Sequence, residues 1–473
     1  MTQAKKILFD GDWREAEETF AVHSPFSGEK LADVFSASAN EMSIAAASAA
    51  RAAREIRVMP RFEVAAGLRK MAAGIEKRKD QFTRVIAQES AKPMIYARGE
   101  VERAVATFSW AAGEAERFTG EVINVDAQAN GRGKSGYTLR IPRGVIYGIT
   151  PFNFPLNLVA HKVAPALASR NAIIIKPSPR TPLTALLLGE VFLESGLPKA
   201  AFQVVPMGVK YISAALESEE IAMISFTGSA PVGWDIKQRS NKKAVALELG
   251  GNAPVIVDSS ADVDVSAAKC VTGAFAYSGQ VCISVQRVYV QEKLFDEWTS
   301  KFIDGAKSLR PGDPLEESTQ ISVMIDEPAA VRVADRTREA ADNGAELLLD
   351  GKREGAMLFP SVLTNTDPEM RIVSEEAFGP VAVVEKFTEL DEAIAMANHG
   401  KYGLQAGIFT RDLGRAQRAA EDLEYGGVII NDTPTFRVDH MPYGGSKESG
   451  FGREGVGYAM REMTEERIII INS

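Results

Sequence analysis

Cys282 is the residue whose type and setting best suit covalent chemistry. It lies in the polar, glycine-containing segment Tyr277-Ser-Gly-Gln-Val-Cys-Ile-Ser284. A thiol attacks as its thiolate, and an ordinary thiol pKa of about 8.5 means that this anion needs stabilisation near neutral pH. Gly279 permits a tight turn that aims backbone N–H groups at the sulfur and at a substrate oxygen. The segment predicts a nucleophile, with a buried structural cysteine as the alternative, whereas Cys270 lies in an Ala/Val helical pattern and is expected to be structural.

One carboxylate has a setting that suits a base. Glu248 lies among apolar residues and directly before two glycines, in Leu247-Glu-Leu-Gly-Gly-Asn-Ala-Pro254. Burial raises the pKa of a carboxyl group toward the range in which it can accept a proton near neutral pH. A general base is therefore one interpretation of Glu248, and a surface cap is the other.

The elements that must hold these groups follow a repeating pattern. From Gly144 onward, short apolar runs alternate with amphipathic segments. We expect strands at 144–149, 172–176, 202–206 and 223–226, with helices at 155–169 and 181–195. This alternation is typical of parallel βαβ units.

A second α/β series begins near Gly251, and Ala-rich helices precede the first series. We expect strands at 253–257, 284–290, 380–387 and 406–410, with helices at 293–307 and 329–343. The segments 39–53, 61–76 and 100–118 have helical spacing. The apolar run 467–471 predicts a terminal strand, which pairs either with another subunit or with the edge of an internal sheet.

Size and charge narrow the classes of function. The chain has 473 residues, so we expect two or three domains. Its net charge of −9 argues against nucleic acid as a partner, because phosphate binding needs a basic face. Two cysteines are too few for a disulfide framework and favour a reducing cytoplasm. We expect no membrane partner, since no apolar run approaches the roughly 20 residues of a membrane span, and no metal.

The cysteine and glutamate segments together resemble the paired signature segments of the aldehyde dehydrogenase superfamily. Further matching segments are Thr150-Pro-Phe-Asn-Phe-Pro155, Lys176-Pro-Ser178, Phe226-Thr-Gly-Ser229, Glu376-Ala-Phe-Gly-Pro380 and Pro442-Tyr-Gly-Gly-Ser-Lys-Glu-Ser-Gly450. The resemblance implies that Cys282 attacks an aldehyde, and that the Asn153 amide and the Cys282 backbone N–H form the oxyanion hole. Glu248 would activate the water that hydrolyses the thioester, which favours water over coenzyme A or phosphate as the acyl acceptor.

The resemblance also implies NAD or NADP as cofactor, although no Gly-x-Gly-x-x-Gly motif follows the first strand. Lys176 resembles the residue that holds the adenosine ribose, while Glu376 and Phe378 resemble those that hold and pack the nicotinamide ribose. The residues expected to contact the cofactor are Thr150, Pro151, Phe152, Lys176, Ser178, Pro179, Arg180, Gly208, Phe226, Gly228, Ser229, Val232, Gly250, Glu376 and Phe378.

The position of Pro179 bears on the choice between the two dinucleotides. Relatives that prefer NAD often carry Glu there, where it accepts from the ribose 2′-hydroxyl. Without that carboxylate, nothing repels a 2′-phosphate, and Ser178 or Arg180 is placed to contact one. NADP is therefore permitted alongside NAD, and the alternative for Arg180 is that it points to solvent.

The substrate is less well defined. The segments Phe154-Pro-Leu-Asn-Leu-Val-Ala-His-Lys162 and Asn431-Asp-Thr-Pro-Thr-Phe-Arg437 most resemble the branch of lactaldehyde and non-phosphorylating glyceraldehyde-3-phosphate dehydrogenases. In that family Arg103, His161 and Arg437 would line the substrate tunnel, where they could form a cradle for an anion, with Arg287 as a weaker candidate. The alternative is that the arginines are structural ion-pair partners and the histidine packs. Relatives that take phosphorylated aldehydes commonly have Arg at the position of Val281, so a hydroxyaldehyde and a short anionic aldehyde both remain open.

The resemblance predicts an α/β fold with three parts. These are a doubly wound, Rossmann-like NAD(P)-binding domain (1–120 and 142–250), an α/β catalytic domain (251–440) and a small β arm for oligomerisation (121–141 and 455–473). We expect a homodimer or homotetramer that acts on a small aldehyde. The rival interpretations are a coenzyme A-acylating aldehyde dehydrogenase and a non-catalytic binding protein of the same fold, against which the presence of Cys282, Glu248 and Asn153 argues.

Overall fold

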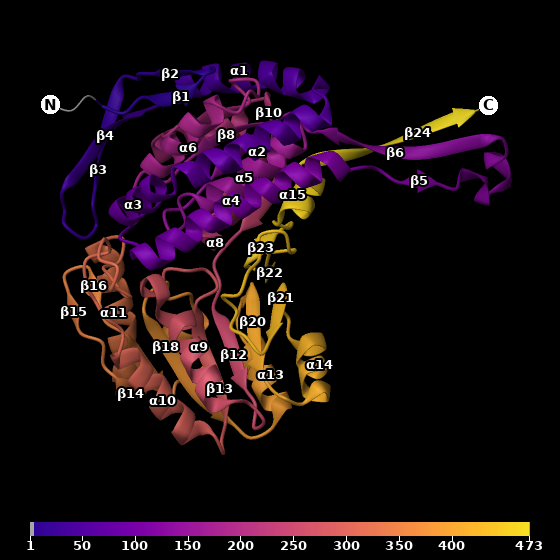
Figure 1. The fold of residues 1–473 in the computed structure, drawn as a ribbon. Coiled ribbons are helices and arrows are strands. Elements are labelled where there is room, and N and C mark those ends of the chain that lie inside the picture. The colour runs from indigo at the N-terminus through magenta and orange to yellow at the C-terminus, as the bar shows by residue number, and fades with distance from the viewer. Residues whose placement is uncertain (1–3, 473) are drawn as a thin grey trace.

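The computed structural model describes residues 4–472, and two large sheets dominate them (Figure 1). The first sheet has the strand order β2-β1-β9-β8-β7-β10-β11-β23. Its strands are β1 (Ile7–Phe9), β2 (Asp12–Arg14), β7 (Val145–Ile149), β8 (Ala172–Lys176), β9 (Phe202–Val204), β10 (Ile221–Thr227), β11 (Ala244–Glu248) and β23 (Gly450–Phe451). Strands β9, β8, β7, β10 and β11 run parallel, and the order of connection changes direction at β7. In such a doubly wound sheet, ligands bind beyond the carboxyl ends of the strands.

Helices pack on this first sheet and fix its strands. They are α1 (Ala39–Val58), α2 (Arg61–Lys77), α3 (Lys79–Ser90), α4 (Met94–Arg117), α5 (Asn157–Ala168), α6 (Leu183–Leu193), α7 (Ile212–Glu217), α8 (Ala230–Arg239) and α15 (Val456–Glu462). Helix α1 begins with a capping box between Ser38 and Glu41. Strands β7 and β8 are buried along their whole length, because α1 and α5 both pack on them. A hairpin of β3 (Glu18–His23) and β4 (Lys30–Ser36) precedes α1.

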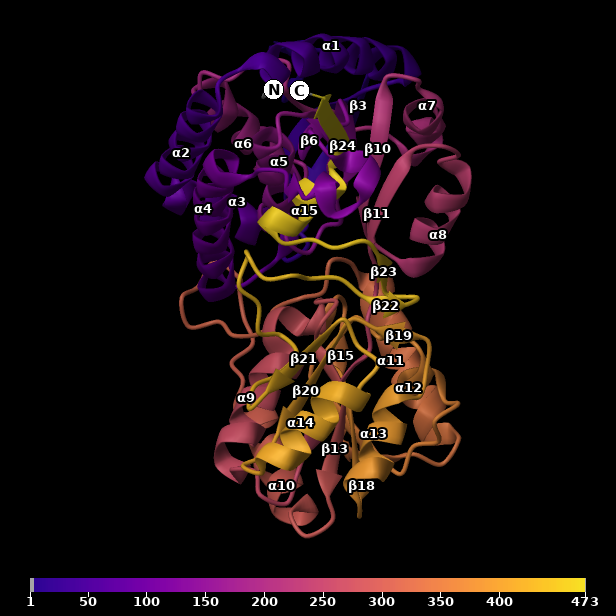
Figure 2. The same cartoon turned by 90° about the vertical axis from the view of Figure 1, so that its right-hand side faces the viewer.

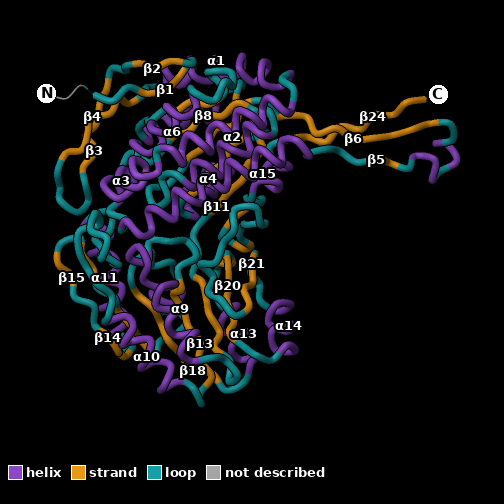
Figure 3. The backbone as a smooth tube through the Cα atoms, viewed as in Figure 1, coloured by secondary structure: helices purple, strands orange, loops and turns teal. Residues whose placement is uncertain are grey.

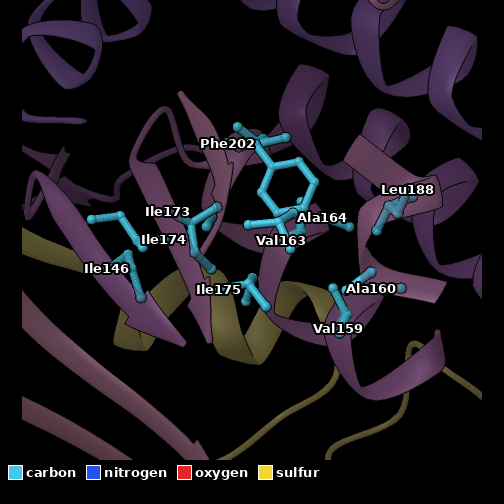
Figure 4. Close-up of a cluster of buried hydrophobic side chains, with 14 of the residues drawn as sticks. Ile146, Val159, Ala160, Val163, Ala164, Ile173, Ile174, Ile175, Leu188 and Phe202 are labelled. Carbon is cyan, nitrogen blue, oxygen red and sulfur yellow. The ribbon is translucent and has the colours of Figure 1, made fainter. Parts of the chain in front are cut away.

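The core beneath the first sheet is made of branched aliphatic side chains. Figure 4 shows Ile173 and Ile175 of β8 beside Val163 of α5, with Phe202 of β9 above them, and all four are fully buried. Burying a side chain of this size contributes about 1.5–3 kcal/mol. This packing fixes the carboxyl ends of β7 and β8, from which the chain continues toward Asn153 and Lys176.

The second sheet has the strand order β14-β17-β18-β13-β12-β20-β21 and is parallel except for β14. Its strands are β12 (Ala253–Val257), β13 (Val285–Gln291), β14 (Glu346–Leu349), β17 (Ser361–Thr364), β18 (Val381–Phe387), β20 (Gln405–Phe409) and β21 (Gly427–Ile430). Its helices are α9 (Val263–Phe275), α10 (Phe295–Lys307), α11 (Glu327–Asp342), α12 (Arg371–Ser374), α13 (Leu390–Asn398) and α14 (Leu413–Asp422). Two short ladders join β15 (Arg353–Glu354) to β16 (Met357–Leu358) and β19 (Tyr402–Gly403) to β22 (Ser446–Lys447). Figure 2 shows this lobe below the first one, with the chain after β21 returning between them.

A three-stranded arm projects from the first lobe (Figure 3). It consists of β5 (Val122–Ile123), β6 (Lys134–Pro142) and β24 (Thr464–Asn472). Strand β24 pairs antiparallel with β6 from end to end, so the terminal strand is matched within its own chain. Ile468, Ile470 and Ile471 of β24 are about half exposed, and within residues 4–472 no strand pairs with the outer edge of β24.

The α/β fold class predicted from the sequence is confirmed, and most expected elements are present. The helix expected at 155–169 starts at Asn157, because the buried Glu100 carboxylate accepts the backbone N–H groups of Leu156 and Asn157. It ends before Arg170, whose φ of 62° breaks the helix. We propose that the chain has the three parts predicted from the sequence. One strand differs: β23 lies outside the residues expected for the cofactor domain, but it completes the sheet of that domain.

No helix within residues 4–472 is both long and apolar enough to cross a membrane.

Candidate active site

The segment before Cys282 is held in an unusual backbone conformation. Tyr277, Ser278 and Gly279 have φ values of 51°, 54° and 67°, all in the left-handed region. Such a conformation costs a non-glycine residue of the order of 1–3 kcal/mol, so surrounding contacts must impose it. A Cβ at Gly279 would lie 2.2 Å from the Gly379 carbonyl oxygen, so the crossing of these two segments excludes any side chain there.

Two hydrogen bonds tie this segment to the rest of the fold. The Tyr277 hydroxyl donates to the Ser90 carbonyl oxygen at 3.0 Å, and the Ser278 hydroxyl donates to the Ser322 carbonyl oxygen at 2.5 Å. Both donors are buried, so losing either acceptor would leave an unsatisfied group. The segment therefore delivers Cys282 at a fixed point just before β13.

The sulfur of Cys282 faces a cavity of about 1030 Å³. It lies 3.2 Å from the hydroxyl oxygen of Tyr443. Burial raises the pKa of the thiol to about 11, the negative charges of Glu376 and Glu248 also raise it, and Tyr443 and Arg437 oppose that rise. The thiol of this free structure is therefore neutral near pH 7, and turnover requires groups that favour the thiolate.

Asn153 follows β7 and brings a side-chain amide to the same cavity. Its Nδ2 donates to the backbone oxygen of Gln280 at 2.9 Å, two residues before the nucleophile. Its Oδ1 is buried and has no hydrogen-bond partner in the part of the chain that the structure describes. The amide nitrogen therefore lies against the nucleophile segment, as an oxyanion donor requires.

The loop that carries Asn153 rests on a buried ion pair. Lys92 and Glu100 are both fully buried and in direct contact. Glu100 caps the start of α5, as described above, and the Lys92 ammonium lies 3.6 Å from the centre of the Phe154 ring. Sequence reasoning missed this pair, because Lys92 lies in the short connection between α3 and α4 and no local pattern shows that it turns inward to Glu100 on α4.

Glu248 ends β11 and lies behind the cavity wall, not in its lining. Its Oε1 approaches Gly444 so closely that a Cβ there would lie 3.0 Å away, and its Oε2 is buried with no partner among the described residues 4–472. Burial raises the pKa of this carboxyl well above its ordinary value, and the negative charge of Glu454 raises it further, against Arg437 and Lys162. A carboxyl with a raised pKa suits a general base, provided that its side chain turns toward the cavity.

A buried ion network lies near Glu248 and influences its pKa. Glu454 accepts from Lys162 Nζ at 2.9 Å and from Arg437 Nη2 at 3.3 Å, and the lysine also donates to the Thr227 hydroxyl at 2.7 Å. Burial alone would raise the pKa of Glu454, but these cations hold it at about 2. Glu454 is therefore the ionised member of the Glu248–Glu454 pair.

The structure brings Arg103, His161 and Arg437 together, but around one of the protein's own carboxylates. Arg103 Nη2 and His161 Nε2 lie 2.8 and 2.9 Å from the same Oδ1 of Asp439, and Arg437 Nη2 lies 3.3 Å from His161 Nδ1. Burial lowers the pKa of His161 to about 4, and the charge of Arg437 lowers it further, so the ring is neutral. Only the two arginines line the cavity. His161 is buried, bonded to Asp439 and outside the lining of the cavity, which favours the alternative that this histidine packs over the prediction that it contacts substrate.

The structure also places Arg287 away from the cavity. It lies on β13, is 2 % exposed and does not line the cavity. Its guanidinium donates to both oxygens of Asn252, to the Ala397 and His399 carbonyl oxygens and to the Tyr425 hydroxyl. These bonds anchor β13 to its neighbours and occupy the guanidinium, so the structure favours the alternative that Arg287 is a structural residue.

Two buried polar groups at the ends of β7 and β8, Thr150 and Lys176, lie outside the lining of the cavity and are poorly paired within residues 4–472. Lys176 ends β8, and burial lowers its pKa to about 8; its Nζ makes one long bond, 3.4 Å to the Pro177 oxygen. Thr150 Oγ1 is buried and has no partner within residues 4–472. A buried polar group with one weak partner or none is costly, so Lys176 and Thr150 fit a bound molecule that offers hydroxyl groups, as the ribose of NAD(P) does.

Glu376 and Phe378 lie at the junction of the two sheets. Glu376 Oε1 accepts from the Gly251 N–H at 3.1 Å, and a Cβ at Gly250 would lie 2.4 Å from Oε2. Burial raises the pKa of Glu376 to about 7. The Phe378 ring meets the Phe152 ring edge-on, with centroids 6.0 Å apart. A carboxylate beside a pair of aromatic rings can hold and pack a ribose, as expected of these residues.

The remaining cofactor candidates divide between the cavity and its surroundings. Those that line it, in addition to Glu376 and Phe378, are Pro151, Phe152, Gly228, Ser229 and Gly250. Those outside its lining are Thr150, Lys176, Ser178, Pro179, Arg180, Gly208, Phe226 and Val232. Ser229 precedes α8, whose N-terminal N–H groups no side chain caps, as suits a pyrophosphate. Arg180 donates to Asp326 at 2.7 Å, which holds it at the surface.

Sequence reasoning also missed Tyr443 and Asp439. Tyr443 lies inside the quoted segment Pro442-Tyr-Gly-Gly-Ser-Lys-Glu-Ser-Gly450, which gave the only signal for it, and Asp439 lies two residues after Arg437. Tyr443 contacts Cys282 and Asp439 contacts Arg103, and both partners lie far away in the sequence.

Comparisons with known proteins agree with this geometry. Residues 13–469 match the model of the aldehyde dehydrogenase family. The 3-sulfolactaldehyde dehydrogenase of Priestia megaterium is 40% identical over 476 residues, which cover 100% of this chain and 99% of the relative. The solved structure of aldehyde dehydrogenase 21 from Physcomitrella patens with the reaction product succinate has a TM-score of 0.97 and 39% identity, and covers 100% and 99% of the two chains. Glyceraldehyde-3-phosphate dehydrogenase GapN from Methanocaldococcus jannaschii, complexed with NADP, has a TM-score of 0.93 and 37% identity over 97% and 100% of the chains.

The fold and these comparisons define an aldehyde-oxidising enzyme that uses NAD or NADP. This chain belongs to the aldehyde dehydrogenase family. The family and branch predicted from the sequence are confirmed.

Proposed function

We propose that this enzyme oxidises a short aldehyde carrying an anionic group, and that it does so through a thiohemiacetal and a thioester on Cys282. The observation that carries the anionic group is the position of Arg103 and Arg437, which line the same cavity as the nucleophile. The relative named for 3-sulfolactaldehyde and the solved structure with succinate support the same class of substrate.

The arrangement indicates a role for each of these residues in the reaction. The Cys282 thiolate attacks the aldehyde carbon, and the oxyanion that forms accepts from Asn153 Nδ2 and from the Cys282 backbone N–H. A bound NAD(P) would supply the acceptor for hydride, and Lys176, Thr150 and Glu376 are the residues that would hold this dinucleotide. Glu248 then takes a proton from water, which attacks the thioester carbon and releases the acid and the thiolate.

The two arginines differ in how much of each is available to an anion. Arg103 binds Asp439 through Nε and Nη2, and its Nη1 has no hydrogen-bond partner within residues 4–472. Its side chain is 31% exposed. Arg437 is buried, stacks on Tyr443 and makes two polar contacts, both of 3.3 Å. Arg103 therefore offers the more accessible donor.

A substrate panel tests this proposal. We would compare kcat/KM for 3-sulfolactaldehyde, succinate semialdehyde, glyceraldehyde 3-phosphate, lactaldehyde and butanal, each with NAD and with NADP. Arg103→Met should lower kcat/KM for the preferred anionic aldehyde about 10- to 100-fold, the value of one charge-assisted hydrogen bond, and leave butanal unaffected. Arg98→Met is the matched control, since Arg98 pairs with Glu317 outside the cavity. Equal kcat/KM for butanal and every anionic aldehyde would contradict the proposal.

The acyl acceptor needs a separate measurement. Glu248 favours water as the acyl acceptor, so the free acid should be the product whether or not coenzyme A is present. Product analysis with and without coenzyme A distinguishes this outcome from acyl transfer, in which an acyl-coenzyme A would accumulate.

We also propose that the arm of β5, β6 and β24 joins copies of the chain into a homodimer or homotetramer in the cytoplasm. The support is the open outer edge of β24 together with the exposed isoleucines on that strand. An unpaired strand edge offers N–H and C=O groups to another chain.

A further inference from the structure

Tyr443 contacts the reacting atom, although the sequence assigned it no role. Its hydroxyl oxygen lies 3.2 Å from the Cys282 sulfur, within the limit for a hydrogen bond to sulfur. The residue is 3% exposed and lines the catalytic cavity. Within residues 4–472 this is the one hydrogen bond that the Tyr443 hydroxyl makes and the one side-chain bond to the sulfur.

The fold holds the Tyr443 ring in place from two sides. The guanidinium carbon of Arg437 lies 3.7 Å from the ring centre, which is a cation–π contact. The backbones of Tyr443 and Glu454 exchange two hydrogen bonds, of 3.0 and 2.6 Å. The ring also packs with Ile283 and Leu404 in a small apolar cluster. A hydroxyl on so constrained a ring cannot easily turn away from the sulfur.

The other charged groups near the sulfur do not replace this contact. Glu376 and Glu248 are acidic, so their ionised forms disfavour a thiolate. Arg437 favours a thiolate, but from the face of the Tyr443 ring and without a hydrogen bond to the sulfur. A buried thiolate needs a donor in contact with it, and the Tyr443 O–H is the side chain placed to give one.

We propose that Tyr443 is a catalytic residue whose hydroxyl donates a hydrogen bond to the Cys282 thiolate and so increases the fraction of the nucleophile that is ionised. The thiol proton leaves to solvent, the tyrosine keeps its own proton, and no bond to Tyr443 forms or breaks. Acylation turns the sulfur into a thioester, which is a much weaker acceptor, and hydrolysis restores the thiolate that the hydroxyl stabilises. This inference rests on the cysteine chemistry of the family and not on the choice of aldehyde.

The pH dependence of alkylation measures it without any substrate. The rate of Cys282 modification by iodoacetamide follows the thiolate fraction, so its midpoint reports the thiol's ionisation. Tyr443→Phe keeps the ring on Arg437 and removes only the oxygen. We expect the midpoint to rise by about one to two pH units, the value of one hydrogen bond to a charged group, and the rate below the midpoint to fall about 10- to 100-fold.

Three comparisons make the result decisive. Tyr96→Phe removes another hydroxyl from the cavity wall, one with no bond to Cys282, and should leave the midpoint where it is. Cys282→Ala identifies any signal from Cys270. Thermal unfolding of Tyr443→Phe shows whether the fold is intact. An unchanged midpoint would overturn the proposal, and so would a lower one, because that would mean that the tyrosine accepts a bond from the neutral thiol.

Discussion

Replacing Glu248 by Gln should separate the two halves of the reaction. The substitution removes the charge and the basic oxygen but keeps the size of a side chain that is 4% exposed. Attack by Cys282 and loss of hydride need the Asn153 amide and the thiolate, whereas hydrolysis needs a base for water. We therefore expect one equivalent of NAD(P)H per active site to form rapidly, followed by turnover slowed about 10²- to 10⁴-fold, the usual contribution of a general base.

The same substitution should not weaken the fold. Burial and the charge of Glu454 raise the pKa of Glu248 above its ordinary value. A group with a raised pKa contributes its stability below its ordinary pKa and loses it as the pH rises through the folded value. Above that value the native enzyme holds an unfavourable charge that Gln lacks, so the melting temperature of Glu248→Gln should equal or exceed that of the parent enzyme.

Stopped-flow absorbance of NAD(P)H across a range of pH gives the test. In the parent enzyme the turnover rate should rise with pH as Glu248 loses its proton, and in Glu248→Gln that limb should be absent. Glu385→Gln is a matched control, because Glu385 is a partly buried carboxyl with a raised pKa that accepts hydrogen bonds from Thr366 instead of facing the nucleophile. Turnover at the parent rate, or loss of the rapid phase along with turnover, would refute the assignment of Glu248 to hydrolysis.

Three further outcomes are expected. Asn153→Ala should lower kcat/KM about 10²- to 10³-fold by removing an oxyanion donor, with dinucleotide affinity unchanged in a fluorescence titration; a parent-like kcat/KM would count against the oxyanion hole. Lys176→Met should raise the Kd for the dinucleotide about 10- to 100-fold, and an unchanged Kd would remove this lysine from the site. Ile470→Glu, on the exposed face of β24, should give a smaller assembly by light scattering, and an unchanged mass would exclude that face.

Local patterns predicted most of the fold. Strand β8 matches its expected bounds, because a buried apolar run there lies between polar Asn171 and Pro177, which cannot continue the ladder. The start of α5 differs by two residues, since it depends on Glu100, a partner more than fifty residues away. Long-range partners of this kind leave no local pattern in the sequence.

The site could be predicted where a segment carries its own chemistry. Cys282 and Asn153 fall in recognisable segments and meet at one cavity. The sequence predicted the anion cradle only in part. Nothing in the spacing of Arg103 and His161 shows that Asp439 binds both of them. Ion pairs made across the fold decide whether an arginine is available to a ligand.

The return of the C-terminal segment to the first sheet has a consequence for biosynthesis. Strand β23 pairs with β11 next to Glu248, and the same returning segment supplies Tyr443 to the sulfur and Glu454 to Lys162. During synthesis, Glu248 and Cys282 are therefore made before Tyr443 and Glu454, the residues that contact the site from the returning segment. The cavity with its supporting contacts can therefore form only after translation has passed Glu454.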